Sequence, residues 1–355
     1  MNGSALNGKS VMSVTGPVAA TALGVTLPHE HLIANAGTQW IYPSDVEQLT
    51  KYTRPYRAEL HGAVQLEPFS YRSAMQQLDF EVAREELAGF AAVGGTTVVD
   101  LGISGYGRDP QALRALSELT GVTVVMGCGE YVEHSHSPYV RHCSAEVIRD
   151  VLLEEISDGA GATGVRPGVI GEIGTGNPAT SDERKVVRGA ALAQLESGLA
   201  LNIHRTIYPD PLATLPVIDE VLALGVDPAK LIISHCDERP EPEFAFEVAR
   251  RGCWVELDTW GMEQWASSAR RGDEYPLRSF DHHRIDLLLS LLDAGFGGQL
   301  LVSHDIAMKP QFTHYGGWGL SHLSSNIRPR LLARGVGEQQ FDELTIVNPA
   351  LAIVS

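Results

Sequence analysis

The sequence predicts a (β/α)₈ barrel, an α/β fold, with a binuclear metal centre at the carboxyl ends of its strands. Eight short apolar runs alternate with segments of helical periodicity along the 355 residues, and several of these runs end in a histidine or a carboxylate. In such a barrel the carboxyl ends of all eight strands surround one mouth, where side chains from distant strands can meet. A doubly wound open sheet is the alternative, but its outer strands lie too far apart to share one site.

The apolar runs and the periodic segments define the expected elements. The expected strands are residues 24–30, 96–101, 122–127, 168–173, 199–204, 231–235, 254–258 and 300–305. The expected helices are residues 74–93, 109–119, 145–157, 181–197, 212–224, 241–251 and 281–294. Gly198 and Gly225 follow two of these helices, as C-terminal caps do. Ser181, followed three residues later by Arg184, offers only half a capping box.

We expect residues 1–355 to form one domain of the barrel type. An N-terminal hairpin, about residues 11–22, precedes the first barrel strand. Two long loops, about residues 33–72 and 259–280, follow the first and seventh strands and are rich in aromatic residues and proline. Loops of this length at the carboxyl end of a barrel usually wall an active site. Packing or an oligomer contact is the alternative for both.

The amino-acid composition argues against several classes of binding partner and of protein. The net charge of −17 argues against a nucleic acid or an anionic membrane surface as partner. The four cysteines are scattered without a C-x-x-C pair, which speaks against a disulfide framework and a zinc knuckle. No signal peptide is recognisable, and no apolar run reaches the ~20 residues that span a bilayer. We therefore expect a cytoplasmic, soluble protein that acts on a small molecule.

The segment His29-Glu30-His31 places two histidines two residues apart at the end of an apolar run. In a strand such residues point to one side, although an isolated H-x-H pair also occurs in surface turns. Further donors end later runs, and the candidate metal ligands are His29, His31, Glu172, His204, His235 and Asp305. Five terminal donors exceed what one tetrahedral catalytic ion needs. We expect two divalent ions per chain, with Glu172 between them and with zinc as the metal; manganese, cobalt or iron are alternatives.

Longer motifs surround these residues. They are VTGP at 14–17, GVTLPHEHL at 24–32, GGTTVVD at 94–100, GRDP at 107–110, GEIGT at 171–175, ISHCD at 233–237 and NP at 348–349. Together they resemble the phosphotriesterase-like branch of the amidohydrolase superfamily over nearly the whole chain. The resemblance implies a buried ion on His29, His31 and Asp305 and a more exposed ion on His204 and His235. It also implies that Asp305 accepts a proton, and it is compatible with a homodimer.

Two positions depart from the organophosphate hydrolases of that family. Those enzymes bridge the metals with a carboxylated lysine, whereas this chain has Glu172, which resembles the phosphotriesterase-homology and phosphotriesterase-related subgroup. They also have an Asp-His pair after the seventh strand, where this chain reads Asp258-Thr259. Because threonine cannot act as a relay base near neutral pH, we do not expect phosphotriester hydrolysis as the native reaction.

The expected function is a divalent-metal-dependent hydrolase in which a metal-bridging hydroxide attacks the carbonyl of a small ester, lactone or N-acyl amide. A promiscuous phosphotriester hydrolase and a metal-binding barrel without turnover are the alternatives. Candidate substrate contacts are Arg205, Tyr131, Trp260 and Lys309. Arg205 would either orient an anionic substrate group or pair with a neighbouring carboxylate. Tyr131 and Trp260 would form an apolar wall or pack within their loops, and His304 is expected to pack between barrel and helices.

Overall fold

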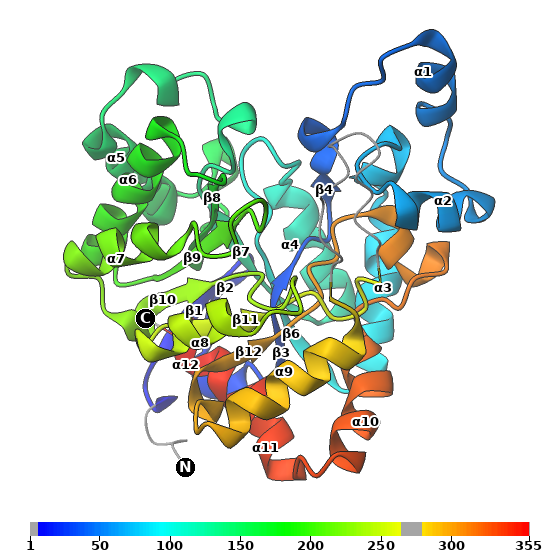
Figure 1. The fold of residues 1–355 in the computed structure, drawn as a ribbon. Coiled ribbons are helices and arrows are strands. Elements are labelled where there is room, and N and C mark those ends of the chain that lie inside the picture. The colour runs from blue at the N-terminus through cyan, green and yellow to red at the C-terminus, as the bar shows by residue number, and fades with distance from the viewer. Residues whose placement is uncertain (1–5, 264–278, 355) are drawn as a thin grey trace.

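The computed structural model describes residues 6–263 and 279–354, and it confirms the predicted barrel (Figure 1). The barrel strands are β3 (Val25–Glu30), β6 (Gly95–Asp100), β7 (Thr123–Cys128), β8 (Val169–Thr175), β9 (Ala200–Arg205), β10 (Leu231–Ile233), β11 (Trp254–Leu257) and β12 (Leu300–Val302). They pair in parallel with their neighbours in chain order. All eight predicted strands are present, and their ends differ from the predicted ends by three residues at most.

The sheet closes where its last strand meets its first. Just beyond β12, the amide of Asp305 donates to the carbonyl of His29 at 3.2 Å, and the amide of His31 donates to the carbonyl of Ile306 at 3.1 Å. The hydroxyl of Ser303 accepts a hydrogen bond from the amide of His29 at 3.1 Å. These bonds lie at the carboxyl ends of β3 and β12, so the closure of the barrel brings the first and last candidate ligands together.

Helices cover the outside of the barrel, as each parallel strand requires a crossover connection. The main helices are α3 (Phe80–Ala92), α4 (Pro110–Thr120), α5 (Ala145–Asp158), α6 (Ser181–Ser197), α7 (Leu215–Ala223), α8 (Glu243–Arg250) and α9 (Asp281–Asp293). Three short helices follow β12: α10 (Arg328–Ala333), α11 (Glu338–Asp342) and α12 (Asn348–Ile353). The seven helices predicted from periodicity are therefore confirmed.

The predicted start of one helix and the predicted cap of another were wrong. Helix α3 begins at Phe80 rather than at residue 74, because the carboxylate of Asp79 accepts the amides of Glu81 and Val82 and caps the helix there. Helix α6 has a complete capping box. It is formed by Thr180 and Glu183, one residue before the Ser181 pair considered from the sequence.

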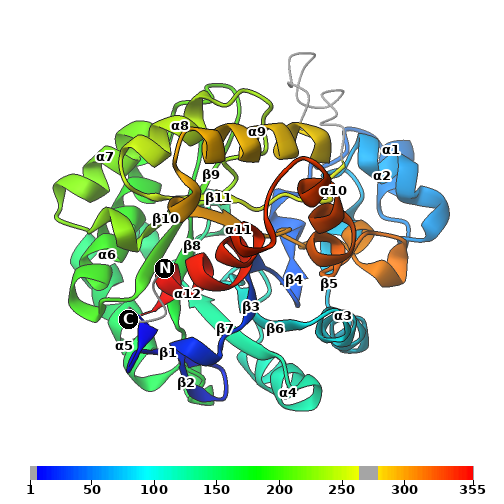
Figure 2. The same cartoon turned by 90° about the horizontal axis from the view of Figure 1, so that it is seen from below.

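The amino-terminal end of the barrel is sealed by both ends of the chain (Figure 2). A hairpin of β1 (Ser10–Ser13) and β2 (Gly16–Ala19) lies beside β7, and the amide of Val14 donates to the carbonyl of Val124 at 2.9 Å. Val11 of this hairpin and Ile353 of α12 share a buried cluster with barrel-interior residues such as Leu301. This apolar plug leaves the opposite, carboxyl end as the open end of the barrel.

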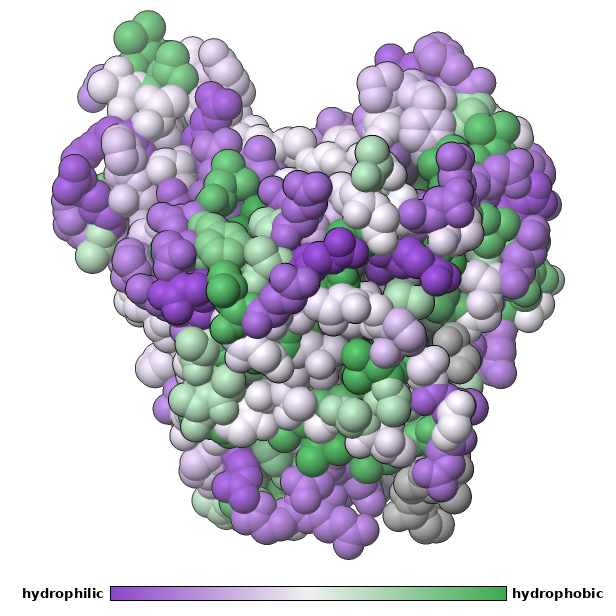
Figure 3. Space-filling view, turned by 180° about the vertical axis from the view of Figure 1, so that it is seen from behind, coloured by the Kyte–Doolittle hydropathy of each residue, from purple (hydrophilic) through white to green (hydrophobic). Residues whose placement is uncertain are grey.

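The insertion after β3 rises above the carboxyl end. It carries β4 (Ala34–Asn35), α1 (Val46–Tyr52) and α2 (His61–Leu66), and β5 (Gln76–Gln77) pairs with β4 before α3 begins. The space-filling view shows the molecule hollowed between this raised part and the side that carries α5 (Figure 3). Most of the other expected loop, residues 264–278, lies outside the described residues. Within the described ranges, no helix has both the length and the apolar character needed to cross a membrane.

The plugged barrel interior gives a first testable prediction. Replacement of the fully buried Leu301 by alanine should lower the free energy of unfolding by ~2–5 kcal/mol, because it removes apolar surface and leaves a cavity. Leu119→Ala is the control, since Leu119 is 66% exposed and should change the unfolding free energy by about 0.5 kcal/mol or less. Urea titration of both variants measures the difference. Equal effects would contradict the assignment of Leu301 to the core.

Candidate metal centre

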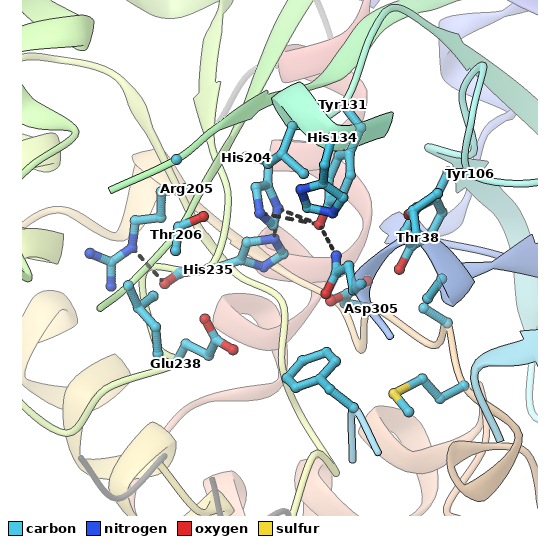
Figure 4. A pocket seen from close by; sticks show the side chains of 18 of the residues that line it. Thr38, Tyr106, Tyr131, His134, His204, Arg205, Thr206, His235, Glu238 and Asp305 are labelled. Atoms are coloured by element: carbon cyan, nitrogen blue, oxygen red, sulfur yellow. Dashed lines mark hydrogen bonds between the residues drawn. The ribbon is translucent and has the colours of Figure 1, made fainter. Parts of the chain in front are cut away.

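Six candidate ligands lie at the carboxyl ends of five barrel strands. They are His29 and His31 at the end of β3, Glu172 in β8, His204 in β9, His235 after β10 and Asp305 after β12. The two β3 histidines, Glu172 and His235 are at most 3% exposed. The side chains of Asp305 and His204 are 17% and 12% exposed, and both reach the cavity that the close-up shows (Figure 4). The structure thus brings together the residues that the sequence selected.

One group of donors is formed by His29, His31 and Asp305. The Nε2 atom of His31 lies 3.2 Å from Oδ1 of Asp305, and Nε2 of His29 lies 3.7 Å from the same oxygen. Glu172 adjoins this group, with its Oε1 3.4 Å from Nε2 of His31. Two imidazole nitrogens and a carboxylate that converge in this way match the ligand types that divalent zinc or manganese takes.

A second group is formed by Glu172, His204 and His235. Oε2 of Glu172 lies 2.9 Å from Nδ1 of His204 and 3.4 Å from Nε2 of His235. The two imidazole nitrogens are themselves 2.7 Å apart. Glu172 therefore offers one oxygen to each group, which is the arrangement required of a carboxylate shared by two ions.

Carboxylates in β11 and directly after it contact the imidazoles of His29 and His235 on the side away from the candidate metal positions. Asp258 lies 2.9 Å from Nδ1 of His29 through one oxygen and 3.0 Å from Nδ1 of His235 through the other. Glu256 also contacts Nδ1 of His29, at 3.1 Å. A hydrogen bond at Nδ1 leaves the Nε2 lone pair free for a metal. Sequence reasoning assigned no role to either carboxylate, although polar residues at 256 and 258 in an apolar strand share one face.

These residues fit divalent metal ions. The Nε2 atoms of His29 and His31 are buried and have no hydrogen-bond partner among the described residues, and both point toward carboxylate oxygens. Without a metal, such nitrogens would retain protons. Burial by itself lowers the pKa of His31, but the neighbouring carboxylates of Asp305 and Glu172 outweigh it and raise that pKa to about 9. Burial would also raise the pKa of Asp258, yet His235 and His29 hold it well below its usual range.

Two ligands have an unusual backbone conformation. Among the described residues, His235 and Asp305 are the non-glycine residues with positive φ, at 58° and 49°. This left-handed region is unfavourable for residues with a Cβ. Such conformations persist where the surrounding contacts hold them, and they are frequent in functional sites.

Arg284 and Asp237 are buried beside Asp258, the carboxylate that contacts the imidazoles of His29 and His235. Asp237 accepts the backbone amides of Asp258 and Thr259, each at 3.2 Å. Arg284 is fully buried, donates through Nε to Oγ1 of Thr259 at 3.0 Å, and lies 3.4 Å from Oδ2 of Asp237. Its Nη1 donates to Asp281 at 3.0 Å. Thr259, which replaces the relay histidine of the organophosphate hydrolases, is thus a hydrogen-bond acceptor for Arg284.

The two groups of donors border a cavity of about 530 Å³. Tyr131 lines it, and the hydroxyl of Tyr131 lies 3.2 Å from Nε2 of His204 and accepts a hydrogen bond from Gln39 at 3.0 Å. Gly174 permits this placement, because a Cβ there would lie 2.2 Å from the carbonyl carbon of Tyr131. Arg205 also belongs to the lining.

Two of the expected substrate contacts do not line this cavity. Trp260 is 1% exposed and packs in the main hydrophobic core, and its backbone amide donates to the carbonyl of Ser303 at 3.3 Å. Lys309 has its Nζ 5.8 Å from the ring centre of Tyr315, outside the lining. Met262 and Glu238, which the sequence did not single out as substrate contacts, line the cavity instead. No local sequence pattern distinguishes a loop residue whose side chain lines the cavity from one whose side chain packs in the core.

His304 lies behind the site. Its Nδ1 is 2.7 Å from Oε1 of Glu30, and its Nε2 accepts the amide of Leu323 at 3.1 Å. The ring is 2% exposed. This position between strand and helix layers agrees with the packing role expected from alternation in the strand.

Comparisons with known proteins find similar chains that match over nearly the whole length. The model of the phosphotriesterase family matches residues 9–353. N-acetyltaurine hydrolase from Mus musculus is 36% identical over 350 residues, which cover 98% of each chain. A resiniferatoxin-binding protein from Rhodobacter sphaeroides superposes with a TM-score of 0.92 at 33% identity, over 98% of this chain and 95% of that one. Organophosphorus hydrolase from Deinococcus radiodurans gives a TM-score of 0.75 at 28% identity, over 98% of both chains.

The position of Asp258 gives a second prediction. Asp258→Asn should weaken metal binding by ~10–100-fold, because an amide cannot accept hydrogen bonds from both imidazoles and so fails to orient both Nε2 atoms. Asp219→Asn is the control, since Asp219 pairs with Arg251 on the surface. Competition with a chromogenic chelator measures the affinity for zinc. Wild-type affinity in Asp258→Asn would show that the carboxylate does not orient the ligands.

Proposed function

We propose that this chain, a hydrolase that belongs to the phosphotriesterase family, uses two divalent metal ions to cleave a small N-acyl amide. The first candidate substrate is an N-acyl derivative of a small amine that carries an acid group, such as N-acetyltaurine. The observation that carries the proposal is the pair of donor groups that share Glu172 beside an open cavity.

The choice of an amide among carbonyl substrates rests on the relatives. Proteins named N-acetyltaurine hydrolase, from Mus musculus and other vertebrates, match this chain over nearly its whole length. The organophosphorus hydrolase is less similar, at 28% identity. The glutamate at position 172 and the threonine at position 259 further distinguish this chain from the organophosphate-hydrolysing pattern.

The cavity suits an amide with unlike ends. Trp40, Phe69 and Met308 contribute apolar surface, and the indole of Trp40 is held by a hydrogen bond from Nε1 to the carbonyl of Ser70 at 2.8 Å. Thr206 belongs to the lining near His235 and Arg205 (Figure 4). The hydroxyl of Thr206 can donate a hydrogen bond to the polar amine part of the substrate, while the apolar side of the cavity suits its acyl group.

The proposed ligands divide the site into two positions. His29, His31 and Asp305 would hold one ion, His204 and His235 the other, and Glu172 would contribute an oxygen to each. When bound, such ions lower the pKa of a water molecule toward ~7 and polarise a carbonyl oxygen. Zinc is the expected metal on the basis of this donor set.

Asp305 and Tyr131 are the side chains that we propose for proton transfer and hydrogen bonding during the reaction. Asp305 lies at the edge of the cavity, so it is placed to accept the proton of the attacking water and to deliver it to the leaving nitrogen. Burial raises the pKa of Tyr131 well above its usual range, so its phenol stays neutral and can donate to the substrate or to His204. An amine leaving group requires such a proton, since its anion is a poor leaving group.

A turnover screen tests the proposed reaction. Metal-free protein, reloaded with Zn²⁺ or Mn²⁺, is assayed on N-acetyltaurine, N-acetyl amino acids, neutral N-acetyl amines, lactones, aryl esters and phosphotriesters. We expect about two ions per chain, activity that is lost on metal removal and regained on reloading, and the highest kcat/KM on an amide with an acid group. Turnover confined to lactones or esters would contradict the amide assignment, and saturation at one ion would contradict the binuclear site.

The role of Asp305 gives a separate prediction. Asp305→Asn keeps one oxygen as a ligand but cannot accept the proton. It should retain most of its metal, bind product with similar affinity and lose at least ~10²-fold in kcat. Metal content and kcat are measured in the same preparation. Turnover within tenfold of wild type at full metal occupancy would exclude Asp305 as the base and direct the search to Glu238, which also lines the cavity.

A further inference from the structure

Arg205 is a buried cation without an acidic partner. It is 2% exposed and forms no ion pair with a carboxylate of the described residues. Nε donates to the carbonyl of His235 at 3.1 Å, and Nη1 donates to the carbonyl of Pro211 at 2.8 Å. Burial lowers the pKa of Arg205. The charges of Glu238 and Asp237 partly oppose this effect, but the hydrogen bonds of the guanidinium go to neutral carbonyls. Such burial is costly for a cation, so the arrangement calls for a specific role.

The direction of the side chain argues against contact with the substrate. Arg205 follows His204 in β9, and successive side chains of a strand point to opposite sides. His204 points into the mouth of the barrel, whereas the guanidinium of Arg205 lies over the ring of Phe244 in α8, 3.8 Å from its centre. Figure 4 shows the guanidinium beside the carbonyl of His235 and turned away from the imidazoles.

The residue that receives this hydrogen bond is in a conformation that needs support. His235 has a φ of 58°, which residues with a Cβ adopt only when contacts hold them. Its amide donates to Asp258, with both carboxylate oxygens 3.0 Å away. Its carbonyl accepts from Arg205. The two peptide groups that flank His235 are therefore held by side chains from the neighbouring strands.

We infer that Arg205 is a positioning residue, which holds the backbone of His235 in the left-handed conformation and so directs Nε2 of His235 toward Glu172 and His204. This inference rests on the proposed function, because it takes these three residues as a metal site. Arg205 acts through His235 and does not itself recognise an anionic substrate group.

The test compares Arg205→Met with Arg239→Met. The first variant keeps an apolar stem over Phe244 but removes the hydrogen bond to His235. Arg239 is the matched control, because it lies in the same region, pairs with Glu241 and has its Nη1 3.4 Å from the carbonyl of Ile207, without contact to His235. Chelator competition measures the affinity for each of the two ions. We expect Arg205→Met to bind one ion ~10–100-fold more weakly and to keep the other, and Arg239→Met to match wild type.

Substrate dependence separates positioning from recognition. In Arg205→Met, kcat/KM should fall by the same factor for N-acetyltaurine and for a neutral N-acetyl amine. Full occupancy of both ions, together with a rise in KM of tenfold or more confined to the anionic substrate, would overturn the inference. If Arg205→Met does not fold, Arg205→Lys serves, because lysine keeps the charge but lacks the rigid fork of the guanidinium; we expect the same selective loss of one ion, and unchanged affinity for both would overturn the inference.

A separate result would count against the proposed function alone. If wild-type protein binds fewer than two ions, the binuclear assignment fails, and the position of His235 is then read from a crystal structure of Arg205→Met. A displaced His235 side chain with an altered φ supports the positioning role. An unchanged His235 overturns it.

Discussion

The carboxylate of Asp258 is the contact on which the order of the site depends. Its two oxygens lie 2.9 Å from Nδ1 of His29 and 3.0 Å from Nδ1 of His235, so one side chain sets the orientation of imidazoles from two different strands. Because each Nδ1 is engaged, each Nε2 is free to face the centre. The same carboxylate accepts the amide of His235, which couples ring orientation to the backbone.

The charged groups around this contact are buried. Desolvation and the neighbouring Asp258 together raise the pKa of Asp237 to about 7, although Arg284 opposes both effects. Buried carboxylates on the inner side are matched by imidazoles, which bind either protons or metal ions. Metal binding at the proposed centre would therefore release protons, and we expect the affinity for metal ions to fall as the pH falls.

The candidate ligands come from the barrel strands, whereas the cavity walls come largely from loops. This difference explains how the site can acquire a substrate preference. The ligands stand on strand ends whose positions are set by the parallel sheet and by its closure at His29 and Asp305. The cavity walls come largely from connections, including the insertion that bears Trp40 and Phe69. A different substrate preference can thus arise on the same barrel through changes in these loops.

The sequence alone determined the eight strands and the six candidate ligands, because apolar periodicity and a donor at the end of a run are local signals. Its local signals placed the start of α3 six residues too early and the cap of α6 one residue too late. Only the tertiary structure decided which side chains contact the candidate ligands on the side away from the cavity. Asp258 meets His29 across more than two hundred positions of the chain, Arg205 turns to the carbonyl of His235, and Trp260 packs into the core. These outcomes depend on which strands become neighbours and on the direction of each side chain in the closed barrel, and neither is encoded within one segment.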